Sequence, residues 1–137
     1  MIIDFHTHVF PPEDQAAPFW RGRCPLTIEN VLEAQAIAGI DKTVISNPFH
    51  ELRDMNLTEQ LANCERMNRY LASMQEKHDS IYAFGVTVPY GGDAFLRELE
   101  RAVKQDGLKG VWLLSSLQGN YPDDDIALPF FQLVTEL

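Results

Sequence analysis

The stretch Ile2-Ile3-Asp4-Phe5-His6-Thr7-His8 opens the chain and predicts a short strand that ends in two histidines. Residues two apart on an extended backbone point to the same side, so His6 and His8 present both imidazoles to one point. Two neutral imidazoles placed in this way hold a divalent metal, with zinc the usual candidate and manganese the second. Asp4 is expected to point the same way, one residue pair deeper, where its carboxylate would orient a ligand or fix the strand.

Short β-prone runs alternate with longer segments of helical periodicity along the chain. Strands are expected at residues 2–5, 42–46, 81–88 and 110–114. Helices are expected to begin after the N-cap residues Thr27, Asn56 and Asp93, and near Asp124 or Asp125. Four strand–helix repeats predict an α/β fold with a parallel sheet and right-handed crossovers. The alternation alone does not separate a doubly wound sheet from half of a (β/α)8 barrel.

The helix after Asn56 has the clearest pattern. Asn56 and Glu59 have the spacing of a capping box, with asparagine as the cap. Apolar residues then recur at the spacing of one helical face, which predicts the buried side of this helix. The residues of this face are Leu57, Leu61, Cys64, Leu71 and Met74.

Composition excludes several classes of protein. The 137 residues carry a net charge of −9, which argues against a nucleic-acid surface because phosphate binding needs clustered lysine and arginine. No apolar run is long enough for a transmembrane helix, and residues 1–4 lack the features of a secretory signal. Cys24 and Cys64 form no CxxC pair, so we expect reduced thiols and a cytoplasmic location. The acidic run 123–125 is interpreted as a solvated loop before a helix rather than as a cation site.

Several segments of the sequence resemble one known family. Ile3-Asp4-Phe5-His6-Thr7-His8-Val9-Phe10-Pro11 is similar to the opening strand of the amidohydrolase superfamily. The resemblance is closer to the amidohydrolase-related branch, which includes aminocarboxymuconate semialdehyde decarboxylase and resorcylate-type decarboxylases. Residues 63–70, 82–89 and 98–111 resemble later helices and strands of that branch. The match covers nearly the whole chain.

This resemblance implies a metal-dependent TIM-like barrel. The expected chemistry is water-assisted hydrolysis or non-oxidative decarboxylation of a small carboxylated or carbonyl substrate at one divalent metal. In the family a later histidine and an aspartate complete the metal site, and a further histidine serves as acid or base. We expect residues 1–137 to form one partial barrel of about four βα units, with the catalytic residues downstream of Leu137. A half barrel exposes strand edges, so we also expect a homo-oligomer, most simply a dimer.

Four residues are weaker candidates for substrate binding. In the decarboxylase branch an arginine of the loop after the first strand helps to hold the substrate carboxylate, a role open to Arg21 or Arg23 here. Asn47 and His50 follow the second strand on the side where active-site loops gather. The alternatives are a solvated loop charge for each arginine, a turn before Pro48 for Asn47, and an exposed loop residue for His50.

Other aromatic and polar residues are given mainly structural interpretations. We expect Trp112 to pack against a helix and His78, before the third strand, to lie on the face opposite the site. Phe10, Phe19, Trp20 and Phe49 are either an aromatic wall beside the metal or ordinary packing residues. Ser115 and Ser116 end the fourth strand on the site face, with no identifiable partners for serine nucleophile chemistry.

Two alternative functions remain open. Another barrel family that opens with His-x-His contains phosphoesterases and deoxyribonucleases that use two or three metals. A non-catalytic half barrel that acts through self-association or a partner chain is the alternative outside enzymology.

Overall fold

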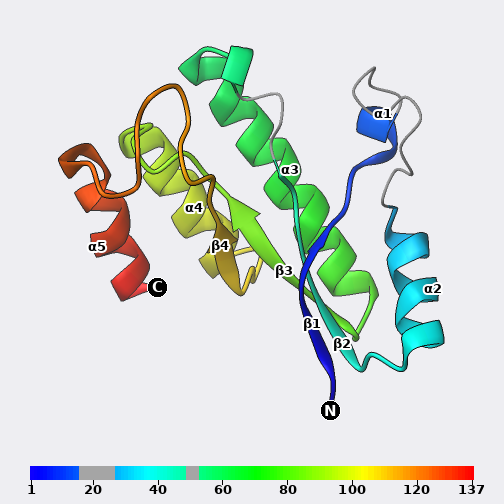
Figure 1. Ribbon diagram of the computed structural model, residues 1–137. Coiled ribbons are helices and arrows are strands. Elements are labelled where there is room, and N and C mark those ends of the chain that lie inside the picture. Colours follow the sequence, from blue (N-terminus) through cyan, green and yellow to red (C-terminus); the bar gives the residue numbers. More distant parts are fainter. Residues whose placement is uncertain (16–26, 49–52) are drawn as a thin grey trace.

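The computed structural model describes residues 1–15, 27–48 and 53–137 (Figure 1). The strands are β1 (Ile3–His8), β2 (Lys42–Ser46), β3 (Ile81–Val86) and β4 (Gly110–Trp112). The helices are α1 (Pro12–Gln15), α2 (Ile28–Ala38), α3 (Leu57–Lys77), α4 (Asp93–Lys104), the 3-10 turn η3 (Asp125–Ala127) and α5 (Leu128–Glu136). No helix in these described ranges is long and apolar enough to cross a bilayer.

The four strands form one parallel sheet in the order β1-β2-β3-β4. Parallel crossovers are right-handed, so a sheet that adds each new strand on the same side carries all its helices on one face. A doubly wound sheet needs a reversal of strand order, and this sheet has none. In Figure 1, α3 and α4 lie side by side behind the sheet. The architecture is therefore half of a TIM-like barrel.

The helix boundaries follow from local capping chemistry. Thr27 caps α2 by accepting a hydrogen bond from the backbone N–H of Asn30, and Gly39 ends the helix in the left-handed region at φ 68°. The predicted capping box of Asn56 and Glu59 is present at the start of α3. These two helices therefore begin where the sequence predicts.

Three sequence-based expectations about elements were wrong in detail. Asp93 does not cap α4, because the N-cap is Gly92 at φ 83° and Asp93 is already helical. Leu57 lies outside the buried face of α3, since it is the first residue of the helix and is 53% exposed. The third and fourth strands end earlier than predicted, at Val86 and Trp112, because the residues beyond them leave the ladder.

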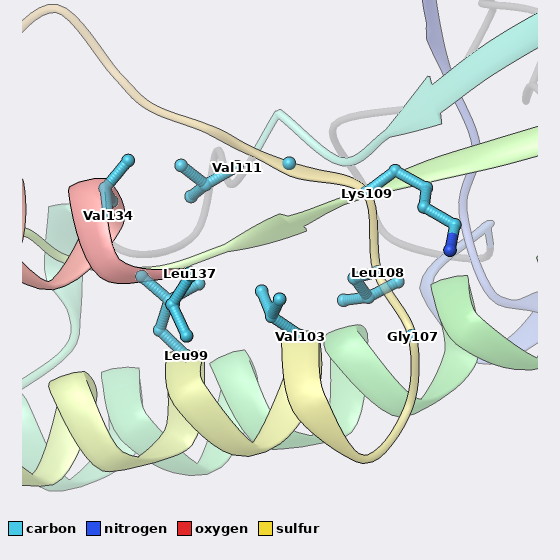
Figure 2. Close-up of a pocket in the computed structure, with 9 residues that line it drawn as sticks. Leu99, Val103, Gly107, Leu108, Lys109, Val111, Val134 and Leu137 are labelled. Atoms are coloured by element: carbon cyan, nitrogen blue, oxygen red, sulfur yellow. The ribbon is translucent and has the colours of Figure 1, made fainter.

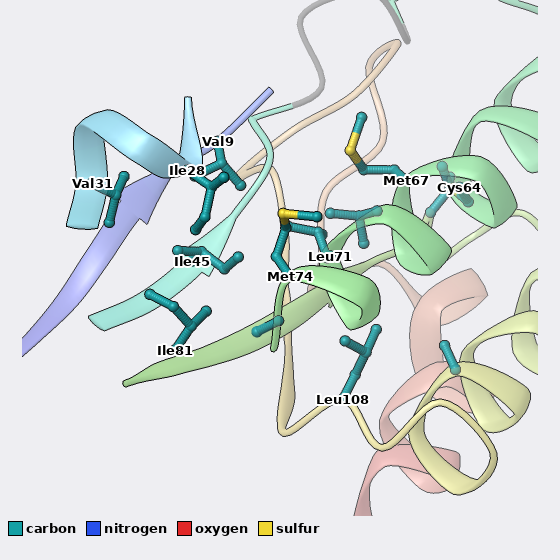
Figure 3. Packing of buried hydrophobic residues seen from close by; sticks show 14 of the residues in the cluster. Val9, Ile28, Val31, Ile45, Cys64, Met67, Leu71, Met74, Ile81 and Leu108 are labelled. Carbon is teal, nitrogen blue, oxygen red and sulfur yellow. The ribbon is translucent and has the colours of Figure 1, made fainter. Parts of the chain in front are cut away.

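The hydrophobic core fills the space between the sheet and the helices that cover it. Ile45 and Ile81 meet Leu71 and Met74 of α3 there, while Ile28 and Val31 of α2 pack nearby (Figure 3). Cys64 is a fully buried free thiol in the same cluster, and burial raises the pKa of this thiol. Cys64 is consequently a packing residue rather than a thiolate ligand.

A buried asparagine on α3 stands in for a missing strand neighbour. Ile45 pairs with Ala83, so continuing the β2–β3 register would place Pro48 opposite Val86. Proline has no N–H to donate. Asn68 bonds Val86 instead: its amide nitrogen donates to the Val86 carbonyl (3.2 Å) and its amide oxygen accepts from the Val86 N–H (2.8 Å).

A partly buried ion pair holds that asparagine. The amide nitrogen of Asn68 also donates to Glu98 Oε1 on α4 at 3.0 Å. Arg101 donates to both Glu98 carboxylate oxygens, at 2.7 and 2.8 Å, and to Asp106 at 2.6 Å. The Glu98 and Asp106 carboxylates raise the pKa of Arg101. The network fixes α3, α4 and the end of β3 relative to one another.

The two outer strands leave apolar surface open. β1 and β4 stand at the edges of the sheet, and on β1 Phe5 is 68% and Ile3 44% exposed. Beside β4, a largely apolar hollow of about 430 Å³ lies between α4 and α5, where Leu99 and Val103 face Val134 and Leu137 (Figure 2). The loop that precedes β4 lines this hollow. The hollow therefore lies near the amino end of β4, away from the carboxyl ends of the strands.

Candidate metal centre

β1 contains a bulge immediately before the histidines reach the end of the strand. Asp4 pairs with Thr43 and Thr7 with Ile45, so Phe5 and His6 together lie opposite the single residue Val44. Such bulges re-aim side chains and occur often beside active sites. The break in the ladder means that regular alternation does not apply across residues 4–7.

The bulge places Asp4 and His8 on opposite faces of the sheet. Asp4 pairs with Thr43, whose hydroxyl accepts a hydrogen bond from Gln35 of α2 at 2.8 Å, so both face the helices. His8 pairs with Ser46, three residues further along β2, and therefore faces the other way. We call that side, which carries Ser46, the inner face of the sheet. The prediction that Asp4 points the same way as the histidines was wrong.

The Asp4 carboxylate instead fixes the shape of the bulge. It accepts hydrogen bonds from the backbone N–H of His6, at 3.2 Å, and from the Thr7 hydroxyl. Both donors lie inside the irregular segment, where the β1–β2 ladder leaves backbone groups without their regular strand partners. Asp4 therefore holds the backbone that carries His6.

The two imidazoles converge as the sequence predicts. The Nε2 atoms of His6 and His8 are 3.1 Å apart, and the two rings meet edge to face with centroids separated by 4.7 Å. Two nitrogens that bind one zinc ion at about 2.0–2.1 Å must lie within roughly 4 Å of each other. The pair meets this requirement, so these residues fit a shared divalent cation.

Two further inner-face residues surround the His8 ring. Its Nδ1 lies 2.9 Å from the hydroxyl oxygen of Ser46, and the ring of Trp112 meets it edge to face at 5.5 Å. Trp112 pairs with Val86 on β3, so it lies on the inner face. Trp112 also packs against the hydrophobic core, so the expected packing role is joined by this contact with His8. Sequence reasoning also missed Ser46, whose only signal was its place as the last residue of a strand.

A second aromatic pair lies on the inner face. Phe5 and Phe84 meet edge to face with ring centroids 5.5 Å apart. Ile45 pairs with Ala83, so the next residues along the two strands, Ser46 and Phe84, lie opposite each other. Phe84 therefore shares the face of Ser46. Together with Trp112, these rings give the inner face an aromatic lining beside the histidines. Phe10, a candidate for that wall, is buried, and its carbonyl accepts hydrogen bonds from Gln15 and Tyr70.

The remaining sequence candidates fall into two groups. Asn47 is buried, and its amide nitrogen donates to the Val9 carbonyl at 2.9 Å, which ties the ends of β1 and β2 together. Its contact with substrate stays a prediction. Arg21, Arg23 and His50 lie outside the described residues, as do Phe19, Trp20 and Phe49.

No third metal-binding group joins the pair within the described ranges. Residues 1–15, 27–48 and 53–137 contain no cluster of three or more histidine, cysteine, aspartate or glutamate side chains placed to hold an ion. The acidic run 123–125 therefore forms no such cluster. The two histidines would supply only part of a coordination sphere, since structural and catalytic zinc sites use at least three protein ligands.

A comparison with protein families identifies the chain. A family model described as Amidohydrolase matches residues 3–137. The chain belongs to the amidohydrolase family. The half barrel and the paired histidines at the end of β1 are thus features of an amidohydrolase chain. A comparison with curated proteins found no match.

Solved structures similar to this amidohydrolase chain include several decarboxylases. The 5-carboxyvanillate decarboxylase of Sphingomonas paucimobilis is 18% identical, with a TM-score of 0.84 over 98% of this chain and 49% of its own. The 2,6-dihydroxybenzoate decarboxylase of Rhizobium is 21% identical, with a TM-score of 0.82 over 98% of this chain and 46% of its own. A dihydroxybenzoic acid decarboxylase from Polaromonas, solved with manganese and the inhibitor 2-nitroresorcinol, is 21% identical, with a TM-score of 0.76 and coverages of 98% and 46%.

Because the sequence identities are low, these similarities establish the fold alone. The chain spans about half the length of each of these three structures, from 46% to 49%. It aligns with them over nearly all its own length, which agrees with a half barrel.

Proposed function

We propose that this chain forms the first half of a metal-dependent decarboxylase that acts on a small aromatic carboxylate. The observation that carries the proposal is the convergence of the His6 and His8 Nε2 atoms, 3.1 Å apart, on the inner face of an amidohydrolase half barrel. The similar structures named as benzoate and vanillate decarboxylases favour decarboxylation over hydrolysis. The manganese bound in one of those structures makes manganese as good a candidate as zinc.

His6 and His8 would hold the cation through their Nε2 atoms, and Asp4 would keep the bulge in the shape that aims them. A bound divalent cation supplies Lewis acidity, which polarises a substrate oxygen. The aromatic side chains Phe5, Phe84 and Trp112 offer a flat apolar surface on the same face. Such a surface favours a planar ring through edge and offset contacts. Arg21 or Arg23 would bind the substrate carboxylate, with Asn47 and His50 as further candidates for substrate contact.

The reaction class is tested by product analysis with the full-length protein and added manganese. From 2,6-dihydroxybenzoate we expect release of carbon dioxide, while the ring carbon gains a proton and a dihydroxybenzene accumulates. The reaction should require the metal and should be lost in His8→Ala. Cleavage of an ester or amide without carbon dioxide release would instead assign the chain to the hydrolases of the family.

We also propose that the chain self-associates, and its open inner face supports this second role. Phe5 is 68% and Ile3 44% exposed on the edge strand β1, and exposed apolar edges pair readily with a second copy. Light scattering coupled to size exclusion should give a dimer for the 137-residue chain, and Phe5→Arg should shift it toward the monomer. A wild-type monomer at every concentration would contradict this role.

The proposal retains the cytoplasmic location expected from the sequence. Cys64 supports it, because this residue is a buried free thiol in the core rather than half of a disulfide. The unfolded chain should react with the same number of equivalents of a thiol reagent before and after reduction, because both cysteines are expected to be free.

A further inference from the structure

We propose that Ser46 is a positioning residue that stabilises the His8 tautomer required for metal binding, an inference that rests on the proposed function. Ser46 and His8 are partners in the β1–β2 register, and the Ser46 hydroxyl oxygen lies 2.9 Å from His8 Nδ1. Ser46 is 3% exposed, so water has little access to compete for this hydrogen bond. The contact joins the end of β2 to the candidate metal ligand on β1.

The chemistry of imidazole gives this contact a specific consequence. A neutral imidazole carries one N–H, and the nitrogen without it supplies the lone pair that binds a metal. If His8 binds through Nε2, which faces His6, its hydrogen must be on Nδ1. The Ser46 oxygen then accepts that hydrogen, and this hydrogen bond favours the metal-binding tautomer.

Serine suits this position because its hydroxyl both donates and accepts. Without a cation, the 3.1 Å separation of the two Nε2 atoms is satisfied when one of them carries hydrogen and donates to the other. When His8 is that donor, the Ser46 hydroxyl rotates and donates to Nδ1. Ser46 therefore accommodates both tautomers of the metal-free pair, and its oxygen would accept from Nδ1 once His8 binds a cation through Nε2.

The ring of His8 is also held by packing, which separates orientation from tautomer choice. Trp112 contacts it edge to face at 5.5 Å, with an angle of 84° between the two ring planes. Removing the Ser46 hydroxyl leaves that aromatic contact in place. The expected loss is therefore of the acceptor that stabilises hydrogen on Nδ1, and only secondarily of the placement of the ring.

Calorimetric titration of the 137-residue chain with Zn²⁺ tests the inference. Loss of a partner behind a metal-binding histidine lowers metal affinity about 10- to 100-fold, and we expect a loss in this range for Ser46→Ala. Ser46→Thr keeps the hydroxyl and should bind zinc within a few-fold of wild type. Thr43→Val is the matched control, because it removes a buried hydroxyl from the same strand on the helix face. It should leave zinc affinity unchanged.

Nitrogen-15 NMR of the histidine rings gives a second readout that does not depend on any variant. In the zinc-loaded wild type, hydrogen on His8 Nδ1 supports the inference, and zinc on Nδ1 overturns it. Equal zinc affinity for wild type and a folded Ser46→Ala would also overturn it, while leaving the metal site intact. Zinc binding that survives removal of both His6 and His8 would overturn the proposed function itself.

Discussion

His6→Ala and His8→Ala are each expected to lower the affinity of the chain for zinc or manganese by about 100-fold or more. Each substitution leaves a single imidazole, and a protein site with one ligand competes poorly with water for a divalent cation. The 3.1 Å separation of the two Nε2 atoms would place them on one ion rather than on two. Titration calorimetry, with chelator competition for tight binding, measures the change directly.

His78→Ala is the matched control for these two variants. His78 is the C-cap of α3 and precedes β3, so it lies at the amino end of the strands, away from His6 and His8. Its removal should leave metal affinity unchanged. If His78→Ala lowered affinity as much as His8→Ala, the cation would not be held by the pair at the end of β1.

Asn68→Ala is expected to destabilise the fold by about 3 kcal/mol. The substitution removes the hydrogen bonds to the Val86 N–H and carbonyl, and the amide that faces Glu98. Each buried polar group left without a partner costs about 1–3 kcal/mol. Asn68 and Val86 are both 0% exposed, so water has no ready access to replace the lost contacts. Urea denaturation followed by circular dichroism measures the free energy of unfolding.

Asn63→Ala makes the same chemical change on the same helix and serves as the control. Asn63 is partly exposed, and its side-chain oxygen accepts one hydrogen bond from Arg66. A loss below about 1 kcal/mol is expected there. Alanine favours a helix more than asparagine does, so propensity cannot cause a loss at either position. Equal destabilisation by the two variants would therefore contradict a special role for the contact between Asn68 and Val86.

Much of the fold could be predicted because its signals are local. The capping box of Asn56 and Glu59 and the Thr27 cap are encoded by residues within one helical turn. The convergence of the His6 and His8 side chains could also be predicted, because a spacing of two residues within one strand is a local signal. The family match over residues 3–137 then confirms the resemblance inferred from these segments.

The site details that escaped prediction depend on pairing between distant segments. The bulge in β1 is a property of its register with β2, and it reverses the face of Asp4 relative to His8. The contacts of His8 with Ser46 and Trp112 likewise join strands that are 38 or more residues apart in sequence. The sequence of β1 alone, interpreted with strictly alternating side chains, does not reveal that its pairing with β2 contains a bulge.

X-ray absorption spectroscopy of the zinc-loaded chain tests the central claim most directly. If His6 and His8 share one cation, the spectrum will show imidazole scattering from two nitrogen ligands at about 2.0–2.1 Å, with the other ligands being oxygen. The imidazole signal should fall by half in His6→Ala. A zinc spectrum dominated by sulfur, or one without imidazole scattering, would contradict the assignment of this pair as the metal centre.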